Sequence, residues 1–212
     1  MFDAPIESIS RRHLLAGGIA AAALALPTAA RASDAPLPDT LTSDAEARLV
    51  ERARRELERS GNAVWIRDKV GLVDFTLPSR DPRFFLVDME QGRIKSYFVT
   101  HGRGSDPEHD GWLKSFSNEP SSNASSRGAY TTGRYYEGKH GLSMRLTGLD
   151  ADNSNAEDRA IVVHGAWYAN PDLIPEMGKL GRSEGCFAFP EAKLIEVIAN
   201  MGPGRLLFAD KL

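Results

Sequence analysis

Two short blocks in the second half of the chain hold residue types that can do covalent chemistry. Residues 161–165 (Ile-Val-Val-His-Gly) have the apolar character of a strand and end in His164 and a glycine. Residues 181–186 (Gly-Arg-Ser-Glu-Gly-Cys) form a glycine-bracketed turn that ends in Cys186, the only cysteine. A thiol is mostly protonated at neutral pH, and a neutral imidazole can take its proton and later return it. The pair predicts a cysteine nucleophile that transfers an acyl group from an amide or ester.

The same turn predicts a place for the negative charge that such a reaction develops. A turn with glycine at its apex exposes successive backbone N–H groups, here those of Gly185 and Cys186. Two such donors can bind the oxyanion of a tetrahedral intermediate. We therefore expect both backbone groups to form an oxyanion hole beside the nucleophile.

Residues 1–32 carry the features of a twin-arginine export signal. Arg11 and Arg12 precede an apolar, uncharged run over 14–26, and Ala30-Arg31-Ala32 supplies the small residues of a cleavage site. A membrane anchor is the alternative, but these thirteen residues would rise only about 20 Å as a helix, which is short for a bilayer. We expect a protein of the periplasm or cell envelope, with no stable membrane span after cleavage.

Export changes the meaning of the lone cysteine. Structural cysteines in oxidising compartments come in pairs, and an unpaired thiol indicates a reactive group or an intermolecular link. An inert buried cysteine remains the alternative reading of Cys186.

Composition limits the classes of partner. The 212 residues carry 26 Lys+Arg and 29 Asp+Glu, a formal charge of −3, and 42% are hydrophobic. This length suits one domain with an appendage and a core that needs no disulfides. No basic run of the kind that follows nucleic acid is present, so we expect no nucleic-acid partner. The sequence does not indicate an oligomeric state.

The elements that must position these residues follow from periodicity. A linker and a helix that starts with the capping box Ser43-Asp44-Ala45-Glu46 occupy 33–69, and the main domain spans 70–212. Strands are predicted at 70–76, 83–88, 93–100, 128–133, 142–146, 161–164 and 206–208, short helices at 171–180 and 190–200, and a long loop at 101–126. We expect a single, mainly β domain with a few short helices and an N-terminal helical extension.

The first helix is amphipathic. Its arginines, Arg48, Arg52, Arg55 and Arg59, lie towards the side opposite Leu49, Val50, Ala53 and Leu57. We expect a solvated face, with binding to an acidic polymer as the alternative.

Taken together, these motifs resemble a known family. His164-Gly165 followed by Ser183-Glu184-Gly185-Cys186 resembles the signature of the L,D-transpeptidase (YkuD-like) catalytic domain. Further segments resemble its murein L,D-transpeptidase branch: 101–106, 116–118, 138–143 and 181–183. The resemblance covers roughly 70–208 and implies a β-sandwich-like domain with the cysteine in a loop over a cleft.

The resemblance also implies a reaction that needs no cofactor. Cys186 would attack the peptide bond between an L-centre and a D-centre in a peptidoglycan tetrapeptide stem, with His164 as base. D-alanine would leave, and an amine of a neighbouring stem would resolve the acyl-enzyme to give a 3→3 cross-link. With water as acceptor the protein would be an L,D-carboxypeptidase or another hydrolase. A non-catalytic wall-binding module is the third reading, and the intact Cys186, His164 and Gly185 argue against it.

The substrate-gripping part of the site is less well specified. Many family members carry Arg or Asn shortly after the cysteine, whereas Phe187-Ala188-Phe189 follows here. Arg182 is the nearest substitute for binding a substrate carboxylate. The remaining substrate-binding candidates are Gly165, Trp167, Ser183 and His101.

Other histidines leave alternatives open. His101, Asp106, His109 and Asp110 could be read as metal ligands, but their spacing matches no common zinc motif, and we predict no metal. His101 is either a residue that closes the cleft or orients the loop, or an ordinary surface histidine. His140 is either a turn residue or a residue of the cleft.

Overall fold

The computed structural model describes residues 43–212, and the export signal predicted at 1–32 and the linker predicted at 33–42 both lie outside this range. Eight strands form one sheet in the order β3-β2-β1-β8-β4-β5-β6-β7. Their bounds are β1 Lys69–Asp74, β2 Phe84–Asp88, β3 Ile94–Tyr97, β4 Gly128–Gly138, β5 Gly141–Gly148, β6 Val162–Gly165, β7 Phe187–Phe189 and β8 Leu206–Asp210. The pairs β1–β8 and β6–β7 are parallel, and the other neighbours are antiparallel.

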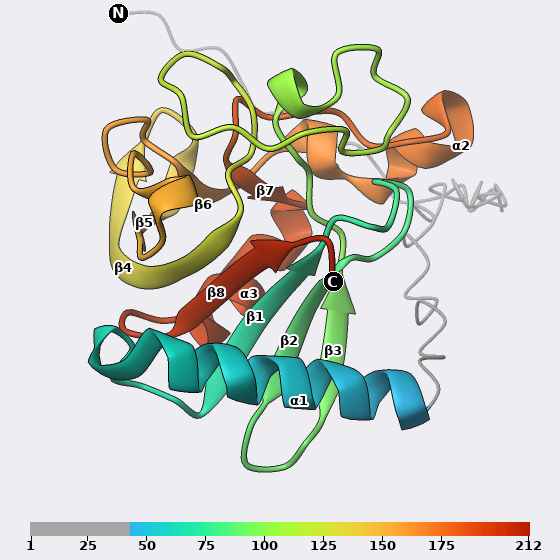
Figure 1. Cartoon of the computed structure of the whole chain (residues 1–212). Helices are drawn as coiled ribbons and strands as arrows, with labels where there is room; N and C mark the ends of the chain where they lie inside the picture. Colours follow the sequence, from blue (N-terminus) through green and yellow to red (C-terminus); the bar gives the residue numbers. More distant parts are fainter. Residues whose placement is uncertain (1–42) are drawn as a thin grey trace, which may run out of the picture. The chain divides into compact units, whose positions relative to one another are not determined.

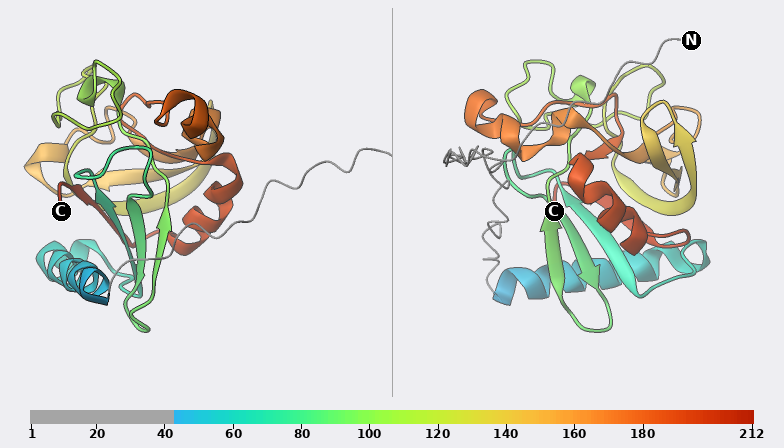
Figure 2. Two further views of the ribbon diagram at one scale, coloured as in Figure 1. Left: turned by 90° about the vertical axis from the view of Figure 1, so that its right-hand side faces the viewer. Right: turned by 180° about the vertical axis from the view of Figure 1, so that it is seen from behind.

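Helices cover both faces of the sheet near its middle (Figures 1 and 2). The α-helices are α1 Ser43–Ser60, α2 Ile174–Met177 and α3 Glu191–Asn200. Short 3₁₀ turns occupy Gly61–Ala63, Arg103–Ser105, Ala151–Asn153, Trp167–Ala169 and Pro171–Leu173. Within the described residues, no helix is both long and apolar enough to cross a membrane.

Alternation along the strands builds two cores. Leu72 and Phe208 pack with Ala53 and Leu57 of α1, whereas residues from the other face of the same strands, such as Leu207, pack with α3. Strands that are covered on both faces read as nearly continuous apolar runs. The α3 core also takes residues from β4 to β7, including Tyr130, Met144, Val163 and Phe187. The sheet therefore bends around one core, which is the sandwich-like arrangement that the sequence predicts.

The predicted mainly β fold with few short helices and an N-terminal helix is confirmed, with three differences. β4 continues to Gly138 and turns directly into β5 at Gly141, so the predicted connection at 135–141 is a tight hairpin. The predicted helix 171–180 is a 3₁₀ turn followed by four residues of α2. β7 was missed, because three residues are too few for a periodic pattern.

The arginine face of α1 is only partly solvated. Arg48 and Arg55 are exposed. Arg52 and Arg59 lie over the Phe208 ring, with their guanidinium carbons 4.7 and 5.8 Å from its centroid. Both guanidinium groups also donate to Glu56. Each arginine thus covers the apolar Phe208 ring while its charge stays paired with a carboxylate. The predicted solvated face is therefore found at Arg48, Arg55 and Arg59, which are exposed, and only Arg52 is half-buried.

Candidate active site

The sheet places His164 and Cys186 on the same side of two adjacent strands. In the parallel β6–β7 ladder His164 pairs with Ala188, and Val163 pairs with Phe187. Val163 and Phe187 point into the core, so His164 and Ala188 face the opposite side, because side chains alternate along a strand. Cys186 immediately precedes β7, and continuing the alternation of β7 by one residue places it on the same side as Ala188. The strand spacing and rise put the Cα atoms of Cys186 and His164 roughly 8 Å apart.

The His164 imidazole carries a free lone pair. Its Nδ1 lies 2.9 Å from the Gly165 carbonyl oxygen, and a carbonyl only accepts, so the neutral ring holds its proton on Nδ1. Nε2 is buried and has no hydrogen-bond partner within the described part of the chain. Burial lowers the pKa of His164 to about 4, with repulsion from His140 and Lys139 as smaller contributions. At neutral pH the ring is therefore a base with Nε2 available.

A second histidine covers the first. His140 lies in the turn between β4 and β5, and its ring stacks on that of His164 with centroids 4.2 Å apart and planes inclined by 18°. Tyr168 approaches His164 edge-on, with a centroid separation of 6.5 Å. His140 itself is exposed, whereas His164 is completely buried. The two readings of His140 are thus both correct, since it is a turn residue that belongs to the site.

Cys186 is a neutral thiol in the resting site. Its Sγ donates to the Ala160 carbonyl oxygen at 3.5 Å, and no hydrogen bond joins it to the His164 ring in residues 43–212. Burial raises the pKa of the thiol, while the Val162 backbone N–H and the charges of Lys139 and Arg159 lower it by less. The thiol and imidazole therefore rest as an uncharged pair and not as a thiolate–imidazolium pair.

The Ser183 hydroxyl holds the turn that carries the cysteine. It donates to the Cys186 carbonyl oxygen at 2.7 Å and accepts from the Gly185 N–H at 3.2 Å. The Gly185 N–H predicted for the oxyanion hole is therefore engaged inside the turn in this state. Ser183 is buried, which contradicts its predicted contact with substrate and makes it a support of the turn.

Glycine is required at position 185. Its φ is +111°, a region that other residues rarely adopt. A Cβ there would lie 2.6 Å from the Ala124 carbonyl oxygen and 2.8 Å from Ile161 Cδ1. The turn therefore packs closely between the long loop, at Ala124, and the residue before β6, Ile161.

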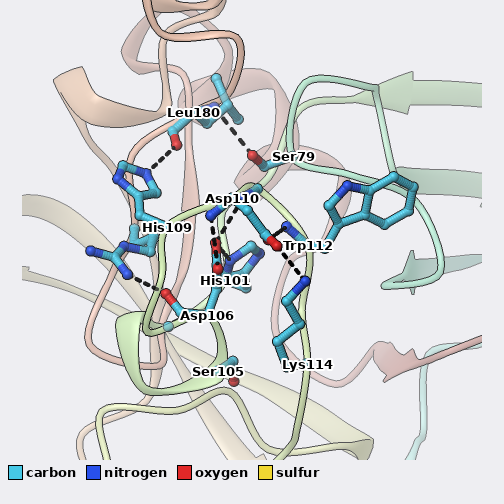
Figure 3. A network of polar contacts seen from close by, with 12 residues as sticks. Ser79, His101, Ser105, Asp106, His109, Asp110, Trp112, Lys114 and Leu180 are labelled. Atoms are coloured by element: carbon cyan, nitrogen blue, oxygen red, sulfur yellow. Dashed lines mark hydrogen bonds and ion pairs between the residues drawn. The ribbon is translucent and has the colours of Figure 1, made fainter.

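His101 is part of a buried network (Figure 3). Arg83 Nη2 donates to His101 Nδ1 at 2.8 Å, so His101 Nε2 carries the proton and donates to Asp106 Oδ2 at 3.2 Å. The Asp106 carboxylate also accepts from the Asp110 and Gly111 N–H groups. Burial, followed by the charge of Arg83, lowers the pKa of His101 to about 3. His101 is 1% exposed, so the surface and substrate-contact predictions are both wrong, and it orients the loop.

The network reaches the catalytic turn through the backbone. The Ser183 N–H donates to the His101 carbonyl at 2.9 Å, and the Arg103 N–H donates to the Ser183 carbonyl at 2.8 Å. Arg182 donates to the carbonyl oxygens of Asp106 and Pro107. Both bonds use Nη1 of its guanidinium, so the loop positions this half-buried side chain, and its binding of a substrate carboxylate stays a prediction.

Sequence reasoning missed Arg159. Its guanidinium donates to the Ser117 carbonyl at 2.7 Å and to the Ala124 carbonyl at 2.5 Å. It ties the long loop to the segment before β6 and lies close enough to lower the pKa of Cys186 by its charge. A lone arginine beside a polar loop carries no sequence pattern that could have indicated this role.

The two remaining candidates differ in exposure. Trp167 is 66% exposed and contacts Tyr168 edge-on at 5.9 Å, so it is available to a substrate. A Cβ at Gly165 would meet Leu194 Cδ2 at 3.2 Å. Helix α3 therefore packs against one side of Gly165, which is itself partly exposed, and its contact with substrate stays a prediction.

The loop residues considered as metal ligands have other partners. The His109 ring bonds the Leu180 carbonyl at 3.0 Å, and Asp110 bonds Lys114 and the Trp112 N–H (Figure 3). Within the described residues, no group of three or more His, Cys, Asp or Glu side chains is arranged to hold a metal ion.

The fold of the chain is similar to those of solved L,D-transpeptidase structures. An L,D-transpeptidase from Mycobacterium smegmatis is 13% identical, with a TM-score of 0.41 over 68% of this chain and 58% of that one. L,D-transpeptidase 3 from Mycobacterium tuberculosis is also 13% identical, with a TM-score of 0.43 over 68% of this chain and 61% of that one. The matched part thus spans about three fifths of the length of these structures. No curated protein sequence matches the chain significantly.

A family-level match covers far more of the chain. The sequence profile of the L,D-transpeptidase catalytic domain matches residues 42–209, which include α1, the sheet except for its last residue Asp210, His164 and the Cys186 turn. The chain belongs to the L,D-transpeptidase catalytic domain family.

Proposed function

We propose that this protein is an exported cysteine acyltransferase that acts on the tetrapeptide stems of peptidoglycan and forms 3→3 cross-links through a Cys186 acyl-enzyme. The main support is the unbonded, buried Nε2 of His164, on the same side of adjacent strands as the single cysteine of the chain. Family membership supports the substrate class. The twin-arginine signal supports a site of action in the periplasm or cell envelope, where that substrate lies.

Acylation begins with a movement of the thiol. Rotation about the Cα–Cβ bond of Cys186 releases Sγ from the Ala160 carbonyl and turns it towards Nε2 of His164. Because both groups are neutral at rest, the proton passes from Sγ to Nε2 as Sγ attacks the carbonyl carbon of the stem peptide bond. The products of this step are an imidazolium and a tetrahedral oxyanion.

The oxyanion requires donors that the turn can supply. The predicted donors are the Cys186 N–H and the Gly185 N–H, and the latter must leave the Ser183 hydroxyl to take part. Such donors stabilise the charge that develops on the former carbonyl oxygen. The C–N bond then breaks, and Nε2–H of His164 protonates the leaving amine of D-alanine.

Transfer to the acceptor reverses the sequence. An amine of a second stem loses a proton to Nε2 and attacks the thioester carbonyl carbon. The C–S bond breaks, the new amide forms, and His164 returns the proton to Sγ. Water in place of the amine would give a tripeptide and complete the alternative hydrolase reaction with the same residues.

The test uses the chain without residues 1–32 and defined tetrapeptide muropeptides, with mass analysis of the products. We expect cross-linked dimers and, with a carbapenem, a covalent adduct on the wild type. Cys186→Ala should form no adduct, and His164→Ala should form it about 100-fold more slowly. Arg134→Ala, at an exposed position of β4, serves as the control. Undiminished labelling of Cys186→Ala would contradict the proposal, tripeptides alone would favour the hydrolase, and binding to sacculi without turnover would favour the wall-binding module.

A further inference from the structure

The β4–β5 hairpin carries a residue onto the catalytic base. Gly138 pairs with Gly141, so Lys139 and His140 form a two-residue turn, and Gly141 has a φ of +70°. In the next ladder Ser143 of β5 pairs with His164 of β6. His140 therefore lies only three residues before Ser143, the strand partner of His164, and its ring can fold back over the His164 ring.

The stack completes the enclosure of the His164 ring. His164 is fixed at Nδ1 by the Gly165 carbonyl at 2.9 Å, at one ring face by His140 at 4.2 Å, and at an edge by Tyr168. Of these, His140 alone is an exposed side chain on a hairpin turn. Removal of its ring would open one face of the imidazole to water and leave the rest of the fold in place.

We propose that His140 is a positioning residue for His164, which holds the catalytic base in the orientation that presents Nε2 to Cys186 and shields its ring from water. This inference rests on the proposed function, in which Nε2 of His164 receives the thiol proton. Offset stacking of flat rings is favourable and restricts their rotation. A buried imidazole also stays neutral more readily than a hydrated one.

Nearby positive charge also keeps the His164 ring neutral. The charge of Lys139 acts on both histidines and that of Glu184 acts on His140, while the titratable Tyr168 ring after β6 contacts His164 edge-on. Protonation of His140 would place an imidazolium parallel to the His164 ring and oppose a second protonation. The pKa of His140 is itself lowered by burial and by Lys139, so both rings are neutral where the reaction runs.

The first test measures His164 directly by NMR titration of its ring in the resting protein, which requires no activity. His140→Ala should raise the pKa of His164 by about one unit or more, because water reaches the ring. His140→Phe keeps the cover and cannot take up a proton, so it removes only the repulsion that a protonated His140 exerts on His164 and should give a smaller rise. Lys139→Gln removes a charge alone and should resemble the Phe variant. An unchanged pKa of His164 in His140→Ala would overturn the proposal.

The second test follows carbapenem acylation of Cys186 at pH 7.5. We expect His140→Ala to lower the limiting acylation rate about fivefold to tenfold, with the half-saturating concentration little changed, because orientation and not binding is lost. His140→Phe should recover most of the rate, and Arg134→Ala on the same hairpin is the control. Equal rates for the wild type and His140→Ala would refute the role. A wild type that is never acylated would refute the proposed function instead, and the titration would still decide the role of His140.

Discussion

Cys186 and His164 share one side of two adjacent parallel strands, yet the Cys186 thiol bonds the Ala160 carbonyl and not the imidazole. Both groups are uncharged at neutral pH, since burial raises the pKa of the thiol and lowers that of the ring. The proposed mechanism therefore moves the thiol proton during attack and does not start from a stored thiolate. This arrangement limits the reaction of the thiol with small electrophiles at neutral pH.

The uncharged pair predicts the pH dependence of thiol alkylation. The iodoacetamide reaction of Cys186, followed by mass spectrometry, should accelerate with pH and show an apparent pKa above the ordinary thiol value of about 8.5. Lys139→Gln should shift the profile to still higher pH, because the Lys139 charge lowers the pKa of the thiol. Rapid alkylation that stays constant down to pH 6 would show a preformed thiolate and contradict this account.

The Ser183 hydroxyl should matter to both folding and rate. Ser183→Ala removes the donor to the Cys186 carbonyl and the acceptor for the Gly185 N–H. We expect a loss of about 1–2 kcal/mol in the free energy of unfolding and about tenfold slower carbapenem acylation, because the turn no longer holds Cys186. Urea unfolding and acylation kinetics measure the two effects. Ser96→Ala in β3 is the control, and an unchanged acylation rate for Ser183→Ala would exclude this role.

Alanine substitutions at Gly178 and Gly185 distinguish the cost of a positive φ from the cost of a steric clash. Gly178 and Gly185 both have positive φ, but a Cβ at Gly178 meets nothing within 4 Å, whereas one at Gly185 would lie 2.6 Å from a backbone oxygen. Gly178→Ala should cost about 1 kcal/mol of stability and leave acylation intact. Gly185→Ala should cost about 3 kcal/mol or more and abolish acylation. Similar stabilities for the two variants would show that the turn has freedom to move.

Two buried histidines predict acid sensitivity. His164 and His101 stay neutral in the folded chain down to pH values of about 4 and about 3, whereas each takes up a proton near pH 6.5 when unfolded. The free energy of unfolding therefore keeps its full value above pH 6.5. It falls as the pH drops towards 4, by about 1.4 kcal/mol per pH unit for each ring, because the unfolded chain takes up protons that the folded chain does not. Urea unfolding at pH 7.5, 6.5 and 5.5 measures this slope.

The variant His101→Asn tests whether His101 causes part of the loss of stability in acid. His101→Asn keeps an acceptor for Arg83 but has no titrating ring, so its stability should be lower at pH 7.5 and should fall about half as steeply with acid. The same slope as in the wild type would mean that other groups take up the protons.

Local patterns predicted much of the fold. The apolar alternation of 83–88 and 93–100 indicated the β2–β3 hairpin, and Pro190 marked the start of α3, because these signals need only neighbouring residues. The strand 187–189 was missed because three residues show no periodicity. The extension of β4 to Gly138 was missed because the register shift between Thr132 and Tyr135 interrupts the alternation along the strand.

The identities of the reacting groups were determined by the sequence itself: a lone cysteine after glycine, and a histidine at the end of an apolar strand. Only the tertiary structure decided how these groups are held. His101 pairs with Arg83 and Asp106 and not with a substrate, and His140 covers His164. Strand order and register bring together residues that lie far apart in the chain, and burial then sets their protonation, so no local pattern could reveal either contact.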